Sequence, residues 1–112
     1  MTRRPSGDIV RQVLVSHGYR VETAGDGTEA VVLYVQNKTD IRAIITDMTM
    51  PHMDGIAMIR VIRNIDPRAK IIATSGLTKH SEETSRLGVQ AFLAKPYAAD
   101  TLLQTLNSVL HA

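Results

Sequence analysis

Apolar residues along the chain either recur every three or four positions or stand in short continuous runs, and each change between these patterns marks a predicted element. Where apolar residues recur every three or four positions, the pattern is typical of a helix with one buried face. The first such helix presents Ile9, Val10, Val13 and Leu14 on one side. The second has Thr28 as its predicted N-cap. Five helices are predicted in this way, at residues 7–17, 28–37, 54–67, 78–87 and 98–110.

Short apolar runs bounded by turn residues separate these helices and predict strands. Runs such as Ile71-Ile72-Ala73 are typical of strands buried on both faces of a parallel sheet. Strands that alternate with helices favour a parallel sheet with helices on both faces, joined by right-handed connections. The chain opens on a helix, whereas a doubly wound α/β unit normally opens on a strand. Four strands are predicted, at residues 19–23, 41–46, 70–75 and 91–93.

Composition narrows the class of protein. With 112 residues, 44% of them hydrophobic and 21% charged, the chain fits one globular domain over residues 1–112. The net charge is +2, and no stripe of Lys and Arg interleaves with aromatic residues, so nucleic-acid binding is not predicted. No apolar run reaches the roughly 18 residues of a membrane span. No signal peptide is recognised either, so a cytoplasmic location is expected. The absence of cysteine excludes disulfides and thiolate metal sites.

Three polar side chains are predicted to meet at one edge of the sheet. Asp47, Ser75 and Lys95 each follow a predicted strand, and ligands of α/β folds bind where such strands end. A carboxylate can attack phosphorus as a nucleophile, while hydroxyl and ammonium groups stabilise charge on phosphoryl oxygens. The combination indicates an acyl-phosphate site. A phosphatase with an Asp nucleophile generally has a second carboxylate two residues on, where this chain has Thr49.

The motifs around these residues resemble those of one family. Asp47 stands in Asp-Met-Thr-Met-Pro-His-Met-Asp-Gly, Ser75 in Ser-Gly, and Lys95 in Phe-Leu-Ala-Lys-Pro-Tyr. With Asp26-Gly27 before the second helix, the chain is similar to the response-regulator receiver domains of two-component signalling over nearly its whole length. The resemblance implies a flavodoxin-like, doubly wound α/β fold with a parallel sheet of strand order 2-1-3-4-5.

The resemblance also implies a role for each matching residue. Asp47 is then the phosphoacceptor, and the hydroxyl of Ser75, or less favourably Thr74, contacts the phosphoryl group. Lys95 contributes its ammonium group and is expected to stay largely solvated until phosphate arrives. Ser75 and Phe92 form the switch, Phe92 being the aromatic residue that turns inward on activation.

The Mg²⁺ site implied by the resemblance is incomplete in this sequence. Its ligands match Asp47 and the backbone carbonyl of Thr49, but the family's acidic pair is absent. Counting back along the chain places that pair near Met1 and Thr2, and the first strand that carries it is missing or replaced. Two interpretations stay open: an incomplete record of an ordinary receiver, or a degenerate receiver that has lost its metal site.

Two functions follow as hypotheses. The first is a phosphoacceptor receiver of a phosphorelay, in which a sensor histidine kinase or phosphotransfer protein donates to Asp47. Such a domain takes part in its own phosphorylation and dephosphorylation but is not a turnover enzyme, and its fourth helix, last strand and last helix change their affinity for a partner. The second is a pseudo-receiver, an interaction module that neither binds Mg²⁺ nor is phosphorylated.

The missing first strand has a consequence for the sheet. In the order 2-1-3-4-5 it lies between the strands at 19–23 and 41–46, so its absence leaves backbone groups unpaired inside the sheet. We therefore expect the chain to re-pair its own strands, to borrow a strand, or to form a homodimer through exposed edges.

Overall fold

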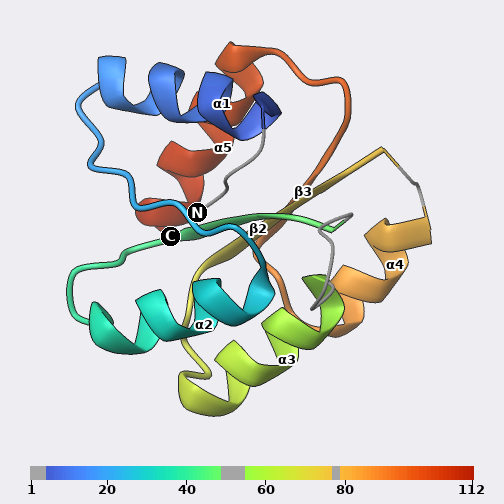
Figure 1. Ribbon diagram of the computed structural model, residues 1–112. Coiled ribbons are helices and arrows are strands. Elements are labelled where there is room, and N and C mark those ends of the chain that lie inside the picture. The colour runs from blue at the N-terminus through green and yellow to red at the C-terminus, as the bar shows by residue number, and fades with distance from the viewer. Residues whose placement is uncertain (1–4, 49–54, 77–78) are drawn as a thin grey trace.

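The computed structural model describes residues 5–48, 55–76 and 79–112, and a parallel sheet of three strands lies at its centre. The strands are β1 (Ile44–Asp47), β2 (Ile71–Ser75) and β3 (Ala91–Ala94), and they lie side by side in chain order. Because all of them run in the same direction, their carboxyl ends share one edge of the sheet (Figure 1). The predicted parallel α/β architecture is confirmed.

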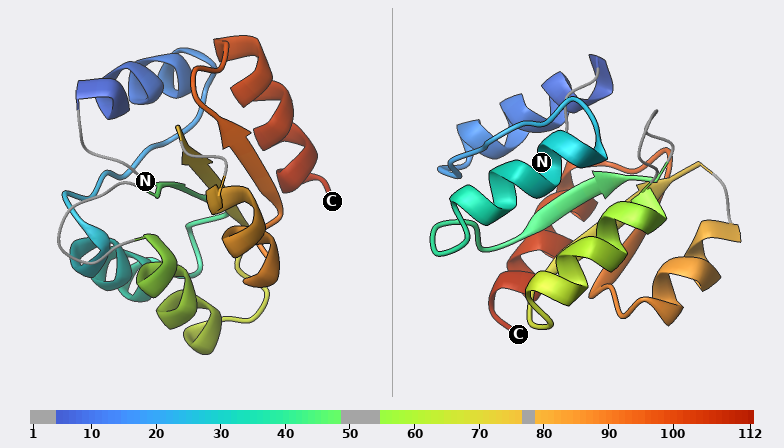
Figure 2. Two further views of the ribbon diagram at one scale, coloured as in Figure 1. Left: turned by 90° about the vertical axis from the view of Figure 1, so that its right-hand side faces the viewer. Right: turned by 60° about the horizontal axis from the view of Figure 1, so that its bottom comes forward.

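Helices cover both faces of this sheet (Figures 1 and 2). Helices α1 and α5 lie on one face and contact each other, while α2 and α3 pair on the other face and α4 contacts β3. No helix in the described part of the chain has the length and apolar character that a membrane span requires. The helices are α1 (Pro5–Ser16), α2 (Gly27–Gln36), α3 (Gly55–Ile65), α4 (Lys79–Arg86) and α5 (Ala99–Leu110).

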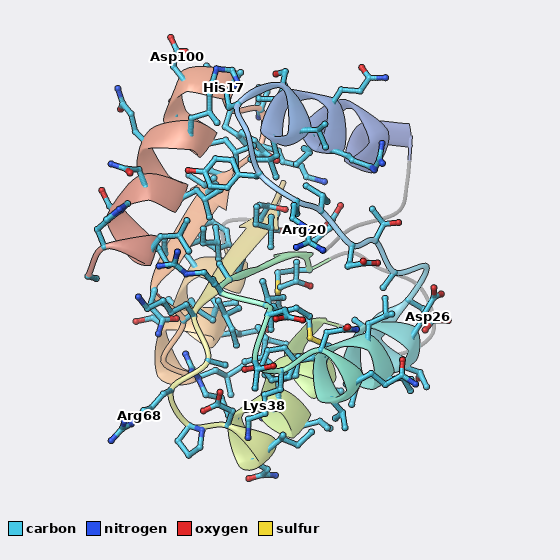
Figure 3. The ribbon with its side chains drawn as sticks, turned by 90° about the vertical axis from the view of Figure 1, so that its left-hand side faces the viewer. His17, Arg20, Asp26, Lys38, Arg68 and Asp100 are labelled. Carbon is cyan, nitrogen blue, oxygen red and sulfur yellow. The ribbon has the colours of Figure 1, made fainter. Side chains whose placement is uncertain are left out.

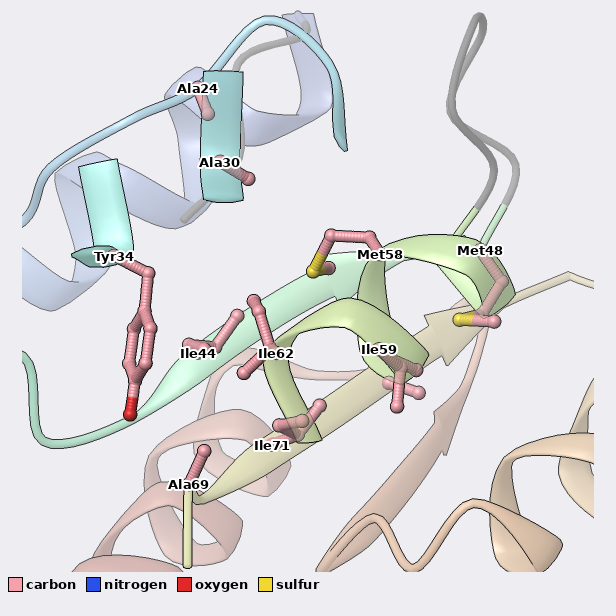
Figure 4. Close-up of a cluster of buried hydrophobic side chains, with 11 residues drawn as sticks. Ala24, Ala30, Tyr34, Ile44, Met48, Met58, Ile59, Ile62, Ala69 and Ile71 are labelled. Carbon is pink, nitrogen blue, oxygen red and sulfur yellow. The ribbon is translucent and has the colours of Figure 1, made fainter. Parts of the chain in front are cut away.

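The core consists of two apolar clusters, one on each face of the sheet. Successive strand residues point to opposite faces, so Ile44 joins the cluster beneath α2 and α3 while Ile45 joins the cluster beneath α1 and α5. Figure 4 shows the first cluster, in which Ile59 and Ile62 of α3 pack with Ile71 of β2. Each of these three side chains is 0% exposed, and burying one contributes roughly 1.5–3 kcal/mol.

Helix α2 begins earlier than the sequence predicts, and Asp26 rather than Thr28 is its N-cap. The Asp26 carboxylate accepts a hydrogen bond of 2.9 Å from the backbone N–H of Glu29. The Glu29 carboxylate in turn accepts one of 2.9 Å from the N–H of Gly25, much as in a capping box. An aspartate can cap the helix and also place its negative charge at the positive end of the helix dipole, which a threonine cannot.

The predicted strand at residues 19–23 is wrong, because this segment forms no backbone hydrogen bond with β1 within the described part of the chain. Its burial still alternates, with Tyr19 and Val21 partly buried and Arg20 and Glu22 exposed. Tyr19 and Val21 pack against the cluster beneath α1 and α5; Figure 3 shows Arg20 on this segment. Apolar contacts hold the segment on the core, but a ladder requires a neighbouring strand. The order 2-1-3-4-5 would supply that neighbour from a first strand, and the described residues contain none before β1.

Candidate functional site

The carboxyl ends of the three strands bring the predicted site residues to one edge. Asp47 ends β1 and is level with Thr74 of β2. Ser75 ends β2 and is level with Ala94, the residue before Lys95. The hydrogen-bond ladder continues past β3, because the N–H of Lys95 donates to the carbonyl of Ser75 at 2.9 Å. Asp47, Ser75 and Lys95 therefore lie at the ends of adjacent strands.

Lys95 forms an ion pair with Asp47 across this edge. Its Nζ lies 2.5 Å from Oδ2 of Asp47, and the two side chains are 32% and 8% exposed respectively. A carboxylate buried to this degree is costly unless a cation compensates its charge, and Lys95 supplies that cation. The expectation that Lys95 stays largely solvated is therefore wrong, because its ammonium group reaches inward to the buried carboxylate.

Tyr97 is a neighbour of this pair that the sequence analysis did not assign to the site. Burial raises the pKa of its hydroxyl, and the negative charge of Asp47 raises it further. The side chain packs against the cluster beneath α1 and α5. The sequence contains one indication that Tyr97 lies near the site: it follows Lys95 by two residues in the Lys-Pro-Tyr motif. The Lys95–Pro96 peptide bond between them is cis.

Three hydroxyl side chains are buried near the strand ends. Ser75 is 1% exposed, Thr74 3% and Thr46 0%. The Thr74 hydroxyl donates to the backbone carbonyl of Thr46 at 3.4 Å, so it is engaged within the sheet. The Thr46 hydroxyl is buried without a hydrogen-bond partner among the described residues, an arrangement that costs about 1–3 kcal/mol.

Phe92 lies on the same face of the sheet as Ser75. It is level with Ala73 of β2, and Ala73 shares a face with Ser75 because strand residues two apart point the same way. The ring is partly buried and packs against the cluster beneath α2 and α3. A movement of Ser75 at the end of β2 can therefore alter the packing of Phe92 on the neighbouring strand.

Met48, the residue that follows Asp47, is closely packed against its neighbours. The N–H of Met48 donates to the carbonyl of Thr74 at 2.8 Å, one step past the end of β1. The first residue of α3, Gly55, lies directly against Met48: a Cβ on Gly55 would be 2.7 Å from Met48 Sδ and 3.0 Å from its Cα. A side chain at position 55 would therefore force Met48 to shift, so the start of α3 packs closely against the end of β1.

The described residues do not by themselves form a Mg²⁺ site. Mg²⁺ is held by oxygen ligands, commonly one or two carboxylates together with waters and phosphate oxygens. Within residues 5–48, 55–76 and 79–112, no group of three or more His, Cys, Asp or Glu side chains could hold a metal ion. Thr49, whose carbonyl is a predicted ligand, lies outside the described residues, as do Met1 and Thr2.

Sequence comparisons agree on one family. The family profile described as the response regulator receiver domain matches residues 5–107. The chemotaxis protein CheY of Bacillus subtilis is 33% identical over 106 residues, which cover 92% of this chain and 87% of that protein.

Solved structures share the fold. A response regulator receiver domain protein from Clostridium thermocellum superposes with a TM-score of 0.88 at 27% identity, covering 93% of this chain and 84% of its own. CheY of Borrelia burgdorferi, in a complex with CheX, BeF3 and Mg²⁺, gives a TM-score of 0.87 at 32% identity, covering 93% of this chain and 80% of its own. The flavodoxin-like fold predicted from the sequence is confirmed, and β1, β2 and β3 correspond to the 3-4-5 part of the predicted order.

Proposed function

The chain belongs to the family of response regulator receiver domains of two-component signalling, and on this premise we propose that it accepts a phosphoryl group on Asp47. The proposed donor is a phosphohistidine on a sensor histidine kinase or a phosphotransfer protein. The phosphorylated and unphosphorylated states then differ in affinity for a further partner, so the domain works as a switch rather than as a turnover enzyme.

The ion pair between the buried carboxylate of Asp47 and Lys95 is the observation that carries this proposal. The carboxylate stands at the edge where α/β folds bind ligands, and the ammonium group is 2.5 Å from it. A positive charge held at this position stabilises negative charge as it develops on phosphoryl oxygens. The two residues thus supply a nucleophile and its electrostatic support.

The proposed transfer uses the carboxylate as the attacking group. One oxygen of Asp47 forms a bond to phosphorus, the P–N bond of the phosphohistidine breaks, and the histidine nitrogen leaves with the bonding electron pair. The aspartyl phosphate carries a charge of about −1.5 to −2 in place of −1. Lys95 then exchanges its bond to the carboxylate for one to a phosphoryl oxygen.

Ser75 and Phe92 are the proposed route from the phosphoryl group to the surface. The Ser75 hydroxyl contacts the phosphoryl group; Thr74 is the weaker candidate because its hydroxyl already donates to a backbone carbonyl. Phe92 lies on the same face as Ser75 and is only partly buried, so it can repack when the end of β2 moves. The surface formed by α4, β3 and α5 changes as a result.

Incubation with acetyl phosphate tests the assignment of Asp47. We expect a mobility shift of the protein on a phosphate-affinity gel, and its loss in Asp47→Asn. Asp40→Asn is the matched control, since Asp40 is an exposed carboxylate in the segment between α2 and β1. If the Asp47→Asn protein still shifts, another group is phosphorylated and the proposal fails.

A pseudo-receiver is the second candidate function. One observation favours it: the described residues hold no cluster of metal-ligating side chains around Asp47. The same gel assay with excess MgCl₂ and with a chelator separates the two candidates. Phosphorylation that requires Mg²⁺ supports the phosphoacceptor. A folded protein that stays unphosphorylated at every Mg²⁺ concentration supports the interaction module.

A further inference from the structure

A second polar site lies at the opposite end of the molecule from Asp47. It is an open groove of about 470 Å³ where the connections enter β2 and β3, at the amino ends of those strands. Three of its six lining residues are arginines, and one amide and two apolar side chains lie beside them. The lining residues are Arg60, Arg63, Asn64, Pro67, Arg86 and Leu87.

Arg63 is held in place by neutral oxygens. Its guanidinium donates to the backbone carbonyls of Pro67 at 3.1 Å and of Ala69, which lie before β2. It also donates to the carbonyl of Gly88 at 2.6 Å and to Oε1 of Gln90 at 3.1 Å, which lie before β3. These acceptors fix the guanidinium without cancelling its charge. The floor of the groove therefore carries a preorganised positive charge.

Arg60 and Arg86 add two further charges at the rim. Both side chains are exposed, and neither forms an ion pair with any residue in the described part of the chain, where Lys95–Asp47 is the only such pair. Glu82 lies one helical turn before Arg86 on α4 but beyond ion-pair distance of it. At the rim of the groove, Arg60 and Arg86 therefore carry positive charges that no ion pair within the described residues neutralises.

Asp66 is a carboxylate near these arginines, and its oxygens already accept hydrogen bonds from other groups. It accepts a hydrogen bond of 2.8 Å from the Tyr34 hydroxyl and one of 3.0 Å from the N–H of Arg68. The hydrogen bond from Tyr34 is the main cause that lowers the pKa of Asp66, the bond from Arg68 adds to it, and the charges of Lys38 and Arg63 contribute least. With three guanidinium groups and one nearby carboxylate, the groove keeps a net positive charge.

We propose that this groove binds an acidic peptide segment of a partner protein, with carboxylates on the guanidinium groups and an apolar side chain against Leu87 and Pro67. Arginine forks bind carboxylates in a bidentate manner, and a groove of about 470 Å³ is far larger than a single small anion needs. A nucleic acid is the less favoured occupant. Its binding relies on aromatic stacking or a broad basic surface, whereas this chain has 4% aromatic residues and a net charge of +2.

A labelled peptide binding assay tests this proposal on the unphosphorylated protein, so that its outcome is independent of Asp47. The probe is a fluorescein-labelled Glu-Glu-Leu-Glu-Glu peptide, and binding is followed by fluorescence anisotropy at low ionic strength. We expect saturable binding that weakens at least about fivefold in Arg60→Gln/Arg86→Gln, the loss typical of two exposed charge pairs. Arg63 is left unchanged because its hydrogen bonds connect three segments of the fold.

The matched control is Arg11→Gln/Arg20→Gln, which removes the same charge from exposed residues of α1 and the following segment. We expect its affinity to stay within about twofold of wild type. An equal loss in both double variants would mean attraction by net charge alone and overturn the proposal. So would equal binding of a Gln-Gln-Leu-Gln-Gln peptide, displacement by millimolar inorganic phosphate, or tighter binding of a short DNA duplex at the same residues.

Discussion

Lys95 compensates the buried negative charge of Asp47 in the unphosphorylated protein, so removing Lys95 should lower the stability of the fold. In Lys95→Ala the Asp47 carboxylate, only 8% exposed, loses its cation. Because Lys95 is 32% exposed and solvent screens the pair, we expect a loss of about 1 kcal/mol rather than the roughly 3–5 kcal/mol of a fully buried pair. Urea unfolding measures this loss.

Two further variants make this prediction specific to the charge. Adding Asp47→Asn to Lys95→Ala should recover most of the lost stability, since the buried negative charge that Lys95 compensates is removed as well. Arg11→Ala, an exposed basic residue elsewhere, should change stability by less than about 0.5 kcal/mol. A Lys95→Ala protein as stable as wild type would show that solvent, and not Lys95, compensates Asp47.

Thr46 and Thr74 offer a matched pair of buried hydroxyls with opposite expectations. In the described part of the chain the Thr46 hydroxyl has no hydrogen-bond partner, so Thr46→Val should raise the free energy of unfolding by about 1 kcal/mol by removing an unsatisfied group. The Thr74 hydroxyl donates to a carbonyl, so Thr74→Val should lower it by about 0.5–1.5 kcal/mol. Thermal melts of both variants measure the changes; the same sign in both would contradict the argument.

The hydrogen bond from Tyr34 to Asp66 predicts a pH-dependent contribution to stability. Burial, the bond to Asp66 and the Asp66 charge raise the pKa of Tyr34 to about 12, and the bond lowers the pKa of Asp66 below 3.8. A raised tyrosine pKa stabilises the fold below pH 10, and that stability is lost as the pH rises towards 12. A lowered aspartate pKa stabilises the fold above pH 3.8, and that stability is lost as the pH falls further.

Tyr34→Phe removes the bond and should therefore cost about 1 kcal/mol between pH 5 and pH 9. The difference from wild type should shrink at both extremes of pH, which denaturant unfolding across the pH range measures. A difference that stays constant below pH 3.8 and above pH 10 would show that the tyrosine acts through packing alone.

At the scale of elements, the packing of α3 against the end of β1 depends on Gly55 having no side chain. Gly55→Ala places a Cβ 2.7 Å from Met48 Sδ and 3.0 Å from Met48 Cα. The sulfur can move but the backbone cannot do so cheaply, so we expect a loss of about 1–3 kcal/mol from overpacking. Adding Met48→Ala should relieve only the side-chain part of the clash. A Gly55→Ala protein with wild-type stability would mean that α3 shifts freely relative to β1.

At the scale of the whole molecule, the segment at residues 19–23 tests how the sheet is completed. It packs on the core but makes no ladder with β1 in the described part of the chain, so its amides should exchange with solvent rapidly while those of β2 exchange slowly. Hydrogen exchange read by mass spectrometry or NMR measures this. Light scattering on the same sample distinguishes the mass of one chain, 12.3 kDa, from that of a dimer.

A dimer mass together with protected amides at residues 19–23 would show that a second copy supplies the missing neighbour. A homodimer is one of the three arrangements expected from the sequence, and it stays a prediction. Protected amides at the mass of one chain would instead show that this segment finds a strand partner within its own chain.

The sequence by itself determined the features that depend on local periodicity. The order of helices and strands after residue 27 follows from apolar spacing, because each helix or strand needs one buried face whatever it packs against. The same pattern placed Asp47, Ser75 and Lys95 at one edge, since parallel strands must end together. The resemblance of their motifs to receiver domains was confirmed by the comparisons.

Only the tertiary structure decided what depends on partners distant in sequence. Lys95 is paired with Asp47 across 48 positions, and no local pattern shows that a loop lysine turns inward. The strand expected at residues 19–23 has strand-like burial but lacks a neighbour, and hydrogen bonds between strands require two chain segments. Arg63 joins three segments of the fold. In each case the free energy lies in a contact that forms only once the chain has folded.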